Sequence, residues 1–317
     1  MRLPAESHAS VMGTGIVSVA LLLDGERTFS RVLMWITVLL WIALALGALA
    51  HASRRPTDLA SELRIPASLT GVAGTCVLGA RLALYGWDWV GAALLVIAAL
   101  LWVLLLPGIL GTWMTPTVGA SFLLAVSILA LSGLAELIGE DRSASWLVSV
   151  GVILLAVGLV SYVFVIARFD PRQLLSGRGD QWIAGGALAI AGLTTAELID
   201  STQSLHLLGS LGDAFSATGW VVWGAAMAWL PFLVASELLR PRLGFDVRRW
   251  ATVFPLGMYA AMSFALGRAL GSGALVGFAR IWVWVALAVW ALVAIGSLGR
   301  AWTLLRPSAG DAERPLS

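Results

Sequence analysis

The chain has 317 residues, of which 59% are hydrophobic and 12% charged, and its mean hydropathy is +0.91. An ordinary soluble domain carries about 25% charged residues, so this composition excludes a soluble globular protein and indicates an integral membrane protein. The formal net charge is only +2, every basic residue is an arginine, and no basic surface suited to nucleic acid stands out.

Apolar windows of membrane-spanning length recur along the whole chain, since a transmembrane helix needs about 20 such residues. In chain order the predicted spans are 8–23, 31–51, 65–85, 88–108, 116–138, 144–167, 181–199, 216–238, 248–270 and 278–304. We therefore expect an all-α membrane domain of ten transmembrane helices over residues 1–305. The last residues, 306–317, are polar and contain Pro and Gly, so we expect a disordered cytoplasmic tail.

Arginines in the predicted connections indicate the orientation of the domain. Fourteen of the 20 lie on the same side as the N-terminus if the chain crosses the membrane ten times. Cytoplasmic loops of membrane proteins carry an excess of basic residues. We therefore expect both termini to lie on the cytoplasmic side of the membrane.

Small residues and tryptophans alternate between successive spans. The core windows of the odd-numbered spans contain Gly, Ser or Thr at 26 of 85 positions, against 12 of 90 in the even-numbered spans. Tryptophan has the opposite distribution, with ten in the even windows and only Trp250 in the odd ones. Small residues suit close helix contacts or a polar lumen, whereas large side chains suit a lipid-facing perimeter. The pattern predicts five helical hairpins, with the odd helices forming an inner pore ring and the even helices an outer ring.

A ring of five helices would leave a narrow channel along its axis. With neighbouring axes about 8–10 Å apart and small residues inside, the channel radius is roughly 3 Å. An aromatic ring projecting inward would close it, and Phe254 lies beside a proline in the ninth span. We predict that Phe254 is the pore gate and that Pro255 and Gly257 form its hinge. Phe264 is the alternative gate if the register differs.

Small and hydroxylated residues at helical spacing form one face of several odd spans. The predicted pore-lining residues are Thr14, Gly15, Ser18, Gly71, Thr75, Ser121, Gly192 and Thr195. Such a lumen is uncharged and offers hydroxyl donors, which solvate anions weakly, and it lacks the carboxylates of a cation pathway. The alternative for each position is that a small residue only lets helices pack closely.

Four charged residues lie near the far ends of odd spans: Arg81, Glu136, Glu197 and Arg268. Charges within membrane spans are functional candidates by default. They could form a vestibule that attracts substrate, with Glu136 or Glu197 carrying a proton. Because the signs balance, mutual neutralisation between helices is the competing interpretation.

The sequence gives little support for metal binding or enzymatic catalysis. The three histidines lack metal-ligand spacing, although His8, just before the first span, could sense pH. Motifs of metallopeptidases, serine hydrolases and nucleotide-binding proteins are absent. We therefore expect no enzymatic activity, no metal and no cofactor.

Two segments resemble a known family of membrane proteins. VMGTGIVS (Val11 to Ser18) resembles the first-span signature of the tellurite-resistance and C4-dicarboxylate transporter family, and WATVFPLGMYA (Trp250 to Ala260) resembles its ninth span. That family includes bacterial tellurite-resistance proteins, plant slow anion channels, and fungal malate and sulfite exporters. The resemblance implies a homotrimer in which each protomer has its own five-helix pore, closed by a phenylalanine of the ninth helix, here Phe254.

Taken together, these features predict an anion channel or channel-like uniporter whose partners are small inorganic or dicarboxylate anions. The alternative is a proton-coupled carrier or exporter of C4-dicarboxylates such as malate, or of sulfite. A receptor-like helical bundle without transport activity is the third class. Ion or solute flux would distinguish it from the other two.

Overall fold

The computed structural model describes residues 5–54, 63–175, 179–204, 212–241 and 246–305, and within them the chain forms ten α-helices and no β-sheet. The helices are α1 (Ala9–Asp24), α2 (Arg27–Arg54), α4 (Thr70–Ala83), α5 (Asp88–Gly111), α6 (Leu123–Asp141), α7 (Ser145–Ile166), α8 (Trp182–Ser204), α9 (Gly212–Leu239), α10 (Trp250–Ala269) and α11 (Gly273–Leu305). Each coincides with one predicted span, so the all-α fold is confirmed. The tail 306–317 lies outside the described residues.

Eight of the helices in the described ranges are long and apolar enough to cross a membrane. The other two in the described part of the chain are α1, with 16 residues, and α4, with 14. Each follows directly on a 3-10 turn, Ala5–His8 and Pro66–Leu69, which lengthens the helical segment. Both pack between other helices: α1 contacts α2, α4, α10 and α11, and α4 contacts α1, α2, α5 and α6.

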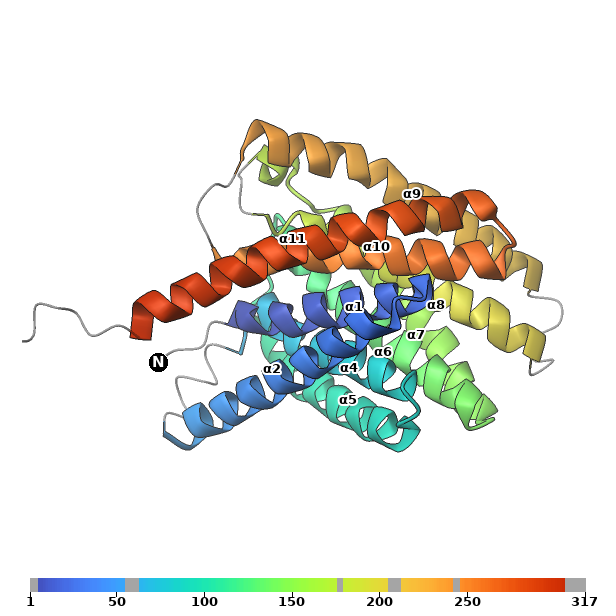
Figure 1. Cartoon of the computed structure of the whole chain (residues 1–317), viewed down its shortest axis with the longest axis horizontal. Coiled ribbons are helices and arrows are strands. Elements are labelled where there is room, and N and C mark those ends of the chain that lie inside the picture. The colour runs from blue at the N-terminus through green and yellow to red at the C-terminus, as the bar shows by residue number, and fades with distance from the viewer. Residues whose placement is uncertain (1–4, 55–62, 176–178, 205–211, 242–245, 306–317) are drawn as a thin grey trace, which may run out of the picture.

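The helices form two layers (Figure 1). In the inner layer α1, α4, α6, α8 and α10 each contact the next, and α10 closes the ring on α1. Each outer helix, α2, α5, α7, α9 or α11, packs on the inner helix that precedes it in the chain. In α6, α8 and α10, 89% of the residues in the apolar window are buried, against 17–28% in the outer helices. This is the predicted arrangement of five hairpins with inner and outer helices.

Large apolar side chains cover the outside of the bundle. Leu39 of α2, Leu104 of α5 and Leu238 of α9 are 66–75% exposed. A soluble protein would not expose apolar side chains on this scale. Such a surface is suited to contact with the acyl chains of membrane lipids.

Tryptophan N–H groups of the outer helices bind hydroxyl groups of the inner helices. Trp41 Nε1 donates to Thr75 Oγ1 at 2.9 Å, Trp290 Nε1 to Thr14 Oγ1 at 3.0 Å, and Trp223 Nε1 to Ser263 Oγ at 3.0 Å. In an apolar bundle each of these groups would be costly if left unpaired. In these three pairs a tryptophan of the outer layer is therefore hydrogen-bonded to a small hydroxylated residue of the inner layer.

Candidate functional site

A cavity of about 210 Å³ lies between the N-terminal ends of the inner helices. Its wall comprises Ala9 and Met12 on α1, Ala67 and Thr70 at the start of α4, Val118, Ala120 and Leu123 at the start of α6, Asp180 and Ile183 at the start of α8, and Arg248, Ala251 and Phe254 at the start of α10. All five inner helices contribute, so this N-terminal cavity is enclosed by the ring.

A second cavity, of about 60 Å³, lies further along the same helices. We call it the C-terminal cavity. Its wall comprises Ile16, Val19, Cys76, Val77, Ala80, Leu84, Leu129, Ala130, Gly133, Leu134, Ile190, Leu193, Thr194, Glu197 and Met258. Again all five inner helices contribute. Most of these side chains are apolar, so the space between the inner helices here is hydrophobic.

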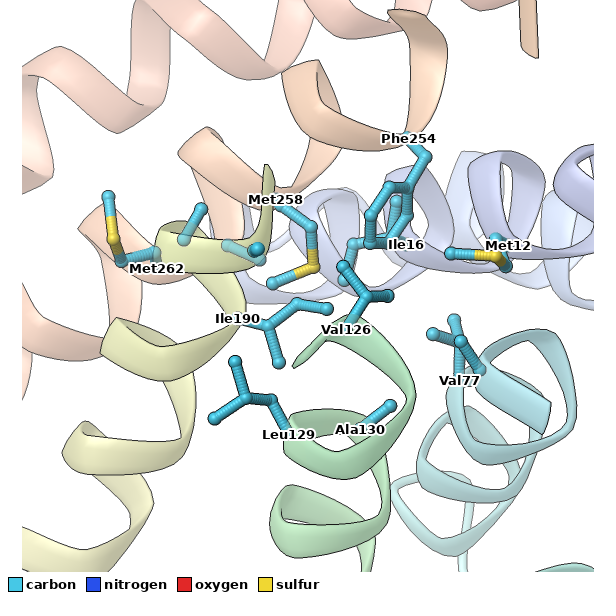
Figure 2. Packing of buried hydrophobic residues seen from close by; sticks show 14 of the residues in the cluster. Met12, Ile16, Val77, Val126, Leu129, Ala130, Ile190, Phe254, Met258 and Met262 are labelled. Atoms are coloured by element: carbon cyan, nitrogen blue, oxygen red, sulfur yellow. The ribbon is translucent and has the colours of Figure 1, made fainter. Parts of the chain in front are cut away.

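Phe254 lies where the N-terminal cavity ends. It forms part of the wall of that cavity and is 2% exposed, whereas Met258, one turn later in α10, lies on the wall of the C-terminal cavity. On α1 the same one-turn step separates Met12 from Ile16. Figure 2 shows the Phe254 ring pointing from α10 into a cluster of apolar side chains that includes Ile16 and Val126. The ring thus stands in the layer between the cavities.

A glycine of α8 makes room for this ring. A Cβ atom added at Gly186 would lie 3.3 Å from Phe254 Cε1 and 2.9 Å from Pro255 Cγ. Contacts under 3.0 Å require neighbouring atoms to shift, so any larger residue at this position would push α10 away from α8. The bare backbone at Gly186 therefore sets the position of the Phe254 ring against α8.

The two predicted hinge residues lie at close helix contacts. Pro255 does not interrupt α10, which is α-helical from Trp250 to Ala269. Gly257 faces α1, because a Cβ added there would lie 2.7 Å from Ile16 Cγ2. In this conformation Pro255 and Gly257 serve close packing on α8 and α1, and a hinge role stays a prediction.

None of the eight predicted pore-lining residues lies on the wall of either cavity. Three of them bind the outer layer instead. Thr14 and Thr75 accept the tryptophan hydrogen bonds described above, and Ser18 Oγ donates to the Ser30 carbonyl oxygen of α2 at 2.7 Å.

The other five predicted lining residues also serve helix contacts or local backbone bonds. A Cβ at Gly15 would meet Val77, one at Gly192 would meet Met262, and the nearest atoms to one at Gly71 belong to the His8 ring at 3.8 Å. Ser121 Oγ accepts a hydrogen bond from the Val118 N–H, and Thr195 Oγ1 donates to the Ala191 carbonyl oxygen. In this conformation these small residues serve helix contacts and local hydrogen bonds, and a pore-lining role stays a prediction.

Of the four predicted vestibule charges, Glu197 alone lies on the wall of an axial cavity. Glu197 lies on the wall of the C-terminal cavity, and its Oε2 is buried without a partner among the described residues. Glu136 is fully buried and accepts a hydrogen bond from Ser132 Oγ at 3.0 Å. Arg81 borders a separate cavity, treated below.

Arg268 lies at the end of α10. Its guanidinium donates to the Leu23 carbonyl oxygen of α1 and lies 5.8 Å from the centre of the Phe264 ring. A cation at the C-terminal end of α1 stabilises the free carbonyl groups there. Phe264, the alternative gate, is 1% exposed and lies on neither cavity wall.

Two charged residues of the N-terminal cavity were not singled out from the sequence. Asp180 Oδ2 accepts a hydrogen bond from the Ala120 N–H at 3.2 Å, and Oδ1 is buried without a partner among the residues described. Arg248 Nε lies 3.5 Å from Asp246 Oδ2, and both side chains are nearly half exposed. Both cavity residues lie at the start of inner spans, which is the signal that could have found them.

Among the described residues, no group of three His, Cys, Asp or Glu side chains could hold a metal ion. The walls of the cavities offer apolar side chains, hydroxyl groups and a few charged groups.

The fold and the cavities define an α-helical membrane protein with a five-helix ring around an interrupted axial space. Residues 2–298 match the model of the family described as voltage-dependent anion channel (SLAC1). The chain therefore belongs to this family.

Curated relatives give a membrane assignment and no activity. An uncharacterized membrane protein of Mycobacterium tuberculosis, found in the CDC 1551 / Oshkosh and H37Rv strains, is 32% identical to this chain over 123 residues. The match covers 37% of this chain and 61% of the relative.

Proposed function

We propose that the protein is an anion channel or channel-like uniporter whose pathway follows the axis of the inner ring and is closed by Phe254. The observation that carries the proposal is the position of the Phe254 ring between two cavities, each lined by all five inner helices. A buried aromatic ring in a dehydrated layer blocks an ion, because no polar group there replaces its hydration shell.

Helix direction favours anions at the N-terminal cavity. The five inner helices begin around this cavity, so their N-terminal ends, which carry partial positive charge, converge on it. At about 0.5 kcal/mol per helix, five ends contribute about 2.5 kcal/mol, equivalent to a roughly 70-fold local enrichment of a monovalent anion. Arg248 adds a positive charge at the same wall, and Asp180 opposes it.

The planar-bilayer current of the purified protein tests this function. With asymmetric potassium chloride across the bilayer, the reversal potential should approach the chloride equilibrium potential, and replacing chloride with a large organic anion should reduce the current. Currents that reverse toward the potassium potential would contradict an anion pathway. Empty bilayers and bilayers with heat-denatured protein are the controls.

We further propose a homotrimer in the bacterial inner membrane with both termini in the cytoplasm. The support is the family resemblance for the trimer and the distribution of arginines for the orientation. Light scattering of the detergent-solubilised protein measures the number of protomers. Reporter fusions at each terminus, active only on one side of the membrane, test the orientation.

A proton-coupled carrier of C4-dicarboxylates or sulfite is the second candidate. It is favoured by Glu197, whose buried Oε2 has no hydrogen-bond partner in the described part of the chain and lies at the C-terminal cavity. A carboxyl group that takes up a proton there would admit an anion and release the proton with it.

Liposome uptake distinguishes the two candidates. A carrier should take up malate or sulfite when a pH gradient is imposed, without channel currents, and Glu197→Gln should abolish that uptake. Uptake that ignores the pH gradient and persists in Glu197→Gln would exclude the coupled mechanism.

A further inference from the structure

A third cavity, of about 280 Å³, carries three arginines and lies away from the ring axis. Its wall comprises Leu22, Arg27, Arg31, Arg81, Leu84 and Tyr85, at the end of α1, the start of α2 and the end of α4. We call it the arginine cavity. Its wall includes no acidic residue, and none of the three arginines forms an ion pair with another described residue. Three like charges therefore face a shared space with no protein counter-charge on its wall.

Arg81 is held in place without being neutralised. Its side chain is 1% exposed; Nε donates to Ser18 Oγ and Nη2 donates to Ser30 Oγ, each at 2.9 Å. The two hydroxyl protons are committed elsewhere, because each serine donates to the backbone carbonyl oxygen of the other at 2.7 Å. The serine lone pairs thus orient the guanidinium, while its full positive charge remains.

One nitrogen of this guanidinium has no partner. Nη1 of Arg81 is buried and makes no hydrogen bond to any residue that the structure describes. A buried cation with an unpaired donor is costly unless an opposite charge approaches. Arg27 and Arg31 are exposed at the same cavity, so their side chains are free to close on an incoming ligand.

We propose that the arginine cavity binds an oxyanion of the sulfate or phosphate class. Arginine presents paired N–H donors that match two oxygens of such a group. Arg81 supplies the fixed charge at the base, and Arg27 and Arg31 bind the ligand from the exposed side. The ligand is either a free oxyanion or the phosphate of a lipid headgroup, because the cavity lies at one end of the bundle and carries exposed apolar residues, Leu84 and Tyr85, on its rim.

The location links this site to the axial space. Leu84 belongs to the wall of both the arginine cavity and the C-terminal cavity. At this end of the ring, the C-terminal ends of the inner helices carry partial negative charge. A cationic site beside that mouth would raise the concentration of anions where the helix ends disfavour them, a role that rests on the proposed function.

Sulfate binding to the detergent-solubilised full chain tests the site. We expect sodium sulfate to raise the melting temperature in a saturable manner at constant ionic strength, and Arg31→Gln or Arg27→Gln to weaken the apparent affinity at least tenfold. Arg142→Gln, which removes another exposed arginine, at the end of α6, is the matched control and should bind as the wild type does. No saturable response in the wild type, or an equal response in Arg31→Gln, would overturn the proposal.

Lipid composition separates the two sources of oxyanion. If a lipid phosphate occupies the cavity, nanodiscs rich in phosphatidylglycerol should abolish the sulfate response, and the lipid should co-purify with the wild type more than with Arg31→Gln. If the ligand is a free oxyanion, the response should persist in those nanodiscs. A protein that conducts anions but shows no sulfate response would refute the arginine site alone, whereas binding without conduction would refute the proposed function alone.

Discussion

Replacing Phe254 with alanine perturbs the layer that separates the two axial cavities. The ring is 2% exposed, and its truncation to Cβ removes the aromatic side chain from the layer between a cavity of about 210 Å³ and one of about 60 Å³. Because the neighbouring layer is apolar, an anion crossing it in the wild type loses most of its hydration. Joining the cavities lets water accompany the ion.

The expected magnitude follows from the barrier that the ring imposes. Lowering that barrier by about 3 kcal/mol raises the rate of ion passage roughly 100-fold, since each 1.36 kcal/mol corresponds to a factor of ten. The same substitution should reduce the free energy of unfolding by about 3–5 kcal/mol, the usual cost of truncating a buried phenylalanine. A change in flux must therefore be separated from a change in stability.

Phe264→Ala provides that separation. Phe264 is on the same helix and is equally buried, but it lies on neither cavity wall. In planar bilayers Phe254→Ala should carry large anion currents, whereas Phe264→Ala should stay near the wild-type level despite a similar loss of stability. Equal currents from both variants, or larger currents from Phe264→Ala, would refute Phe254 as the occluding residue.

Three further substitutions test the surroundings of the gate. Thr75→Val removes the acceptor for Trp41 Nε1, so we expect a loss of about 1 kcal/mol in the free energy of unfolding and unchanged anion flux; altered flux would place Thr75 in the pathway after all. Gly186→Ala introduces a Cβ atom 2.9 Å from Pro255 Cγ, which should displace the gate ring and raise the resting leak in liposome flux assays, whereas Gly224→Ala, where nothing lies within 4 Å, should not. Asp180→Asn removes a negative charge from the N-terminal cavity and should raise anion conductance about 3-fold, the factor for a charge about 6 Å away in water; a decrease in conductance would contradict the electrostatic argument.

Much of the architecture could be predicted from local sequence. The apolar windows located all ten helices, because burial in a bilayer requires a run of apolar residues of fixed length. The alternation of small residues with tryptophans predicted which helices lie inside. Trp41 and Thr75 show its physical cause: a large side chain of the outer layer donates a hydrogen bond to a small one of the inner layer.

The orientation of each inner helix about its own axis was not predictable in the same way. A helix that packs on one side only carries an apolar stripe that identifies its buried face. An inner helix of this ring contacts protein on nearly every side, so its sequence has no such stripe, and Thr14 could face the axis or α11 equally well by pattern alone. The same holds for Arg81, whose partners Ser18 and Ser30 come from two other helices.

The sequence by itself determined that this is a membrane protein of ten helices in two layers. The length and composition of each segment decide whether it is surrounded by lipid or by other helices. Only the tertiary structure decided which residues face the axis and which charges share a cavity. Those relations depend on how neighbouring helices rotate and pack against one another. That packing turned the hydroxyl groups of Thr14 and Thr75 toward the outer layer and left Phe254 between the cavities.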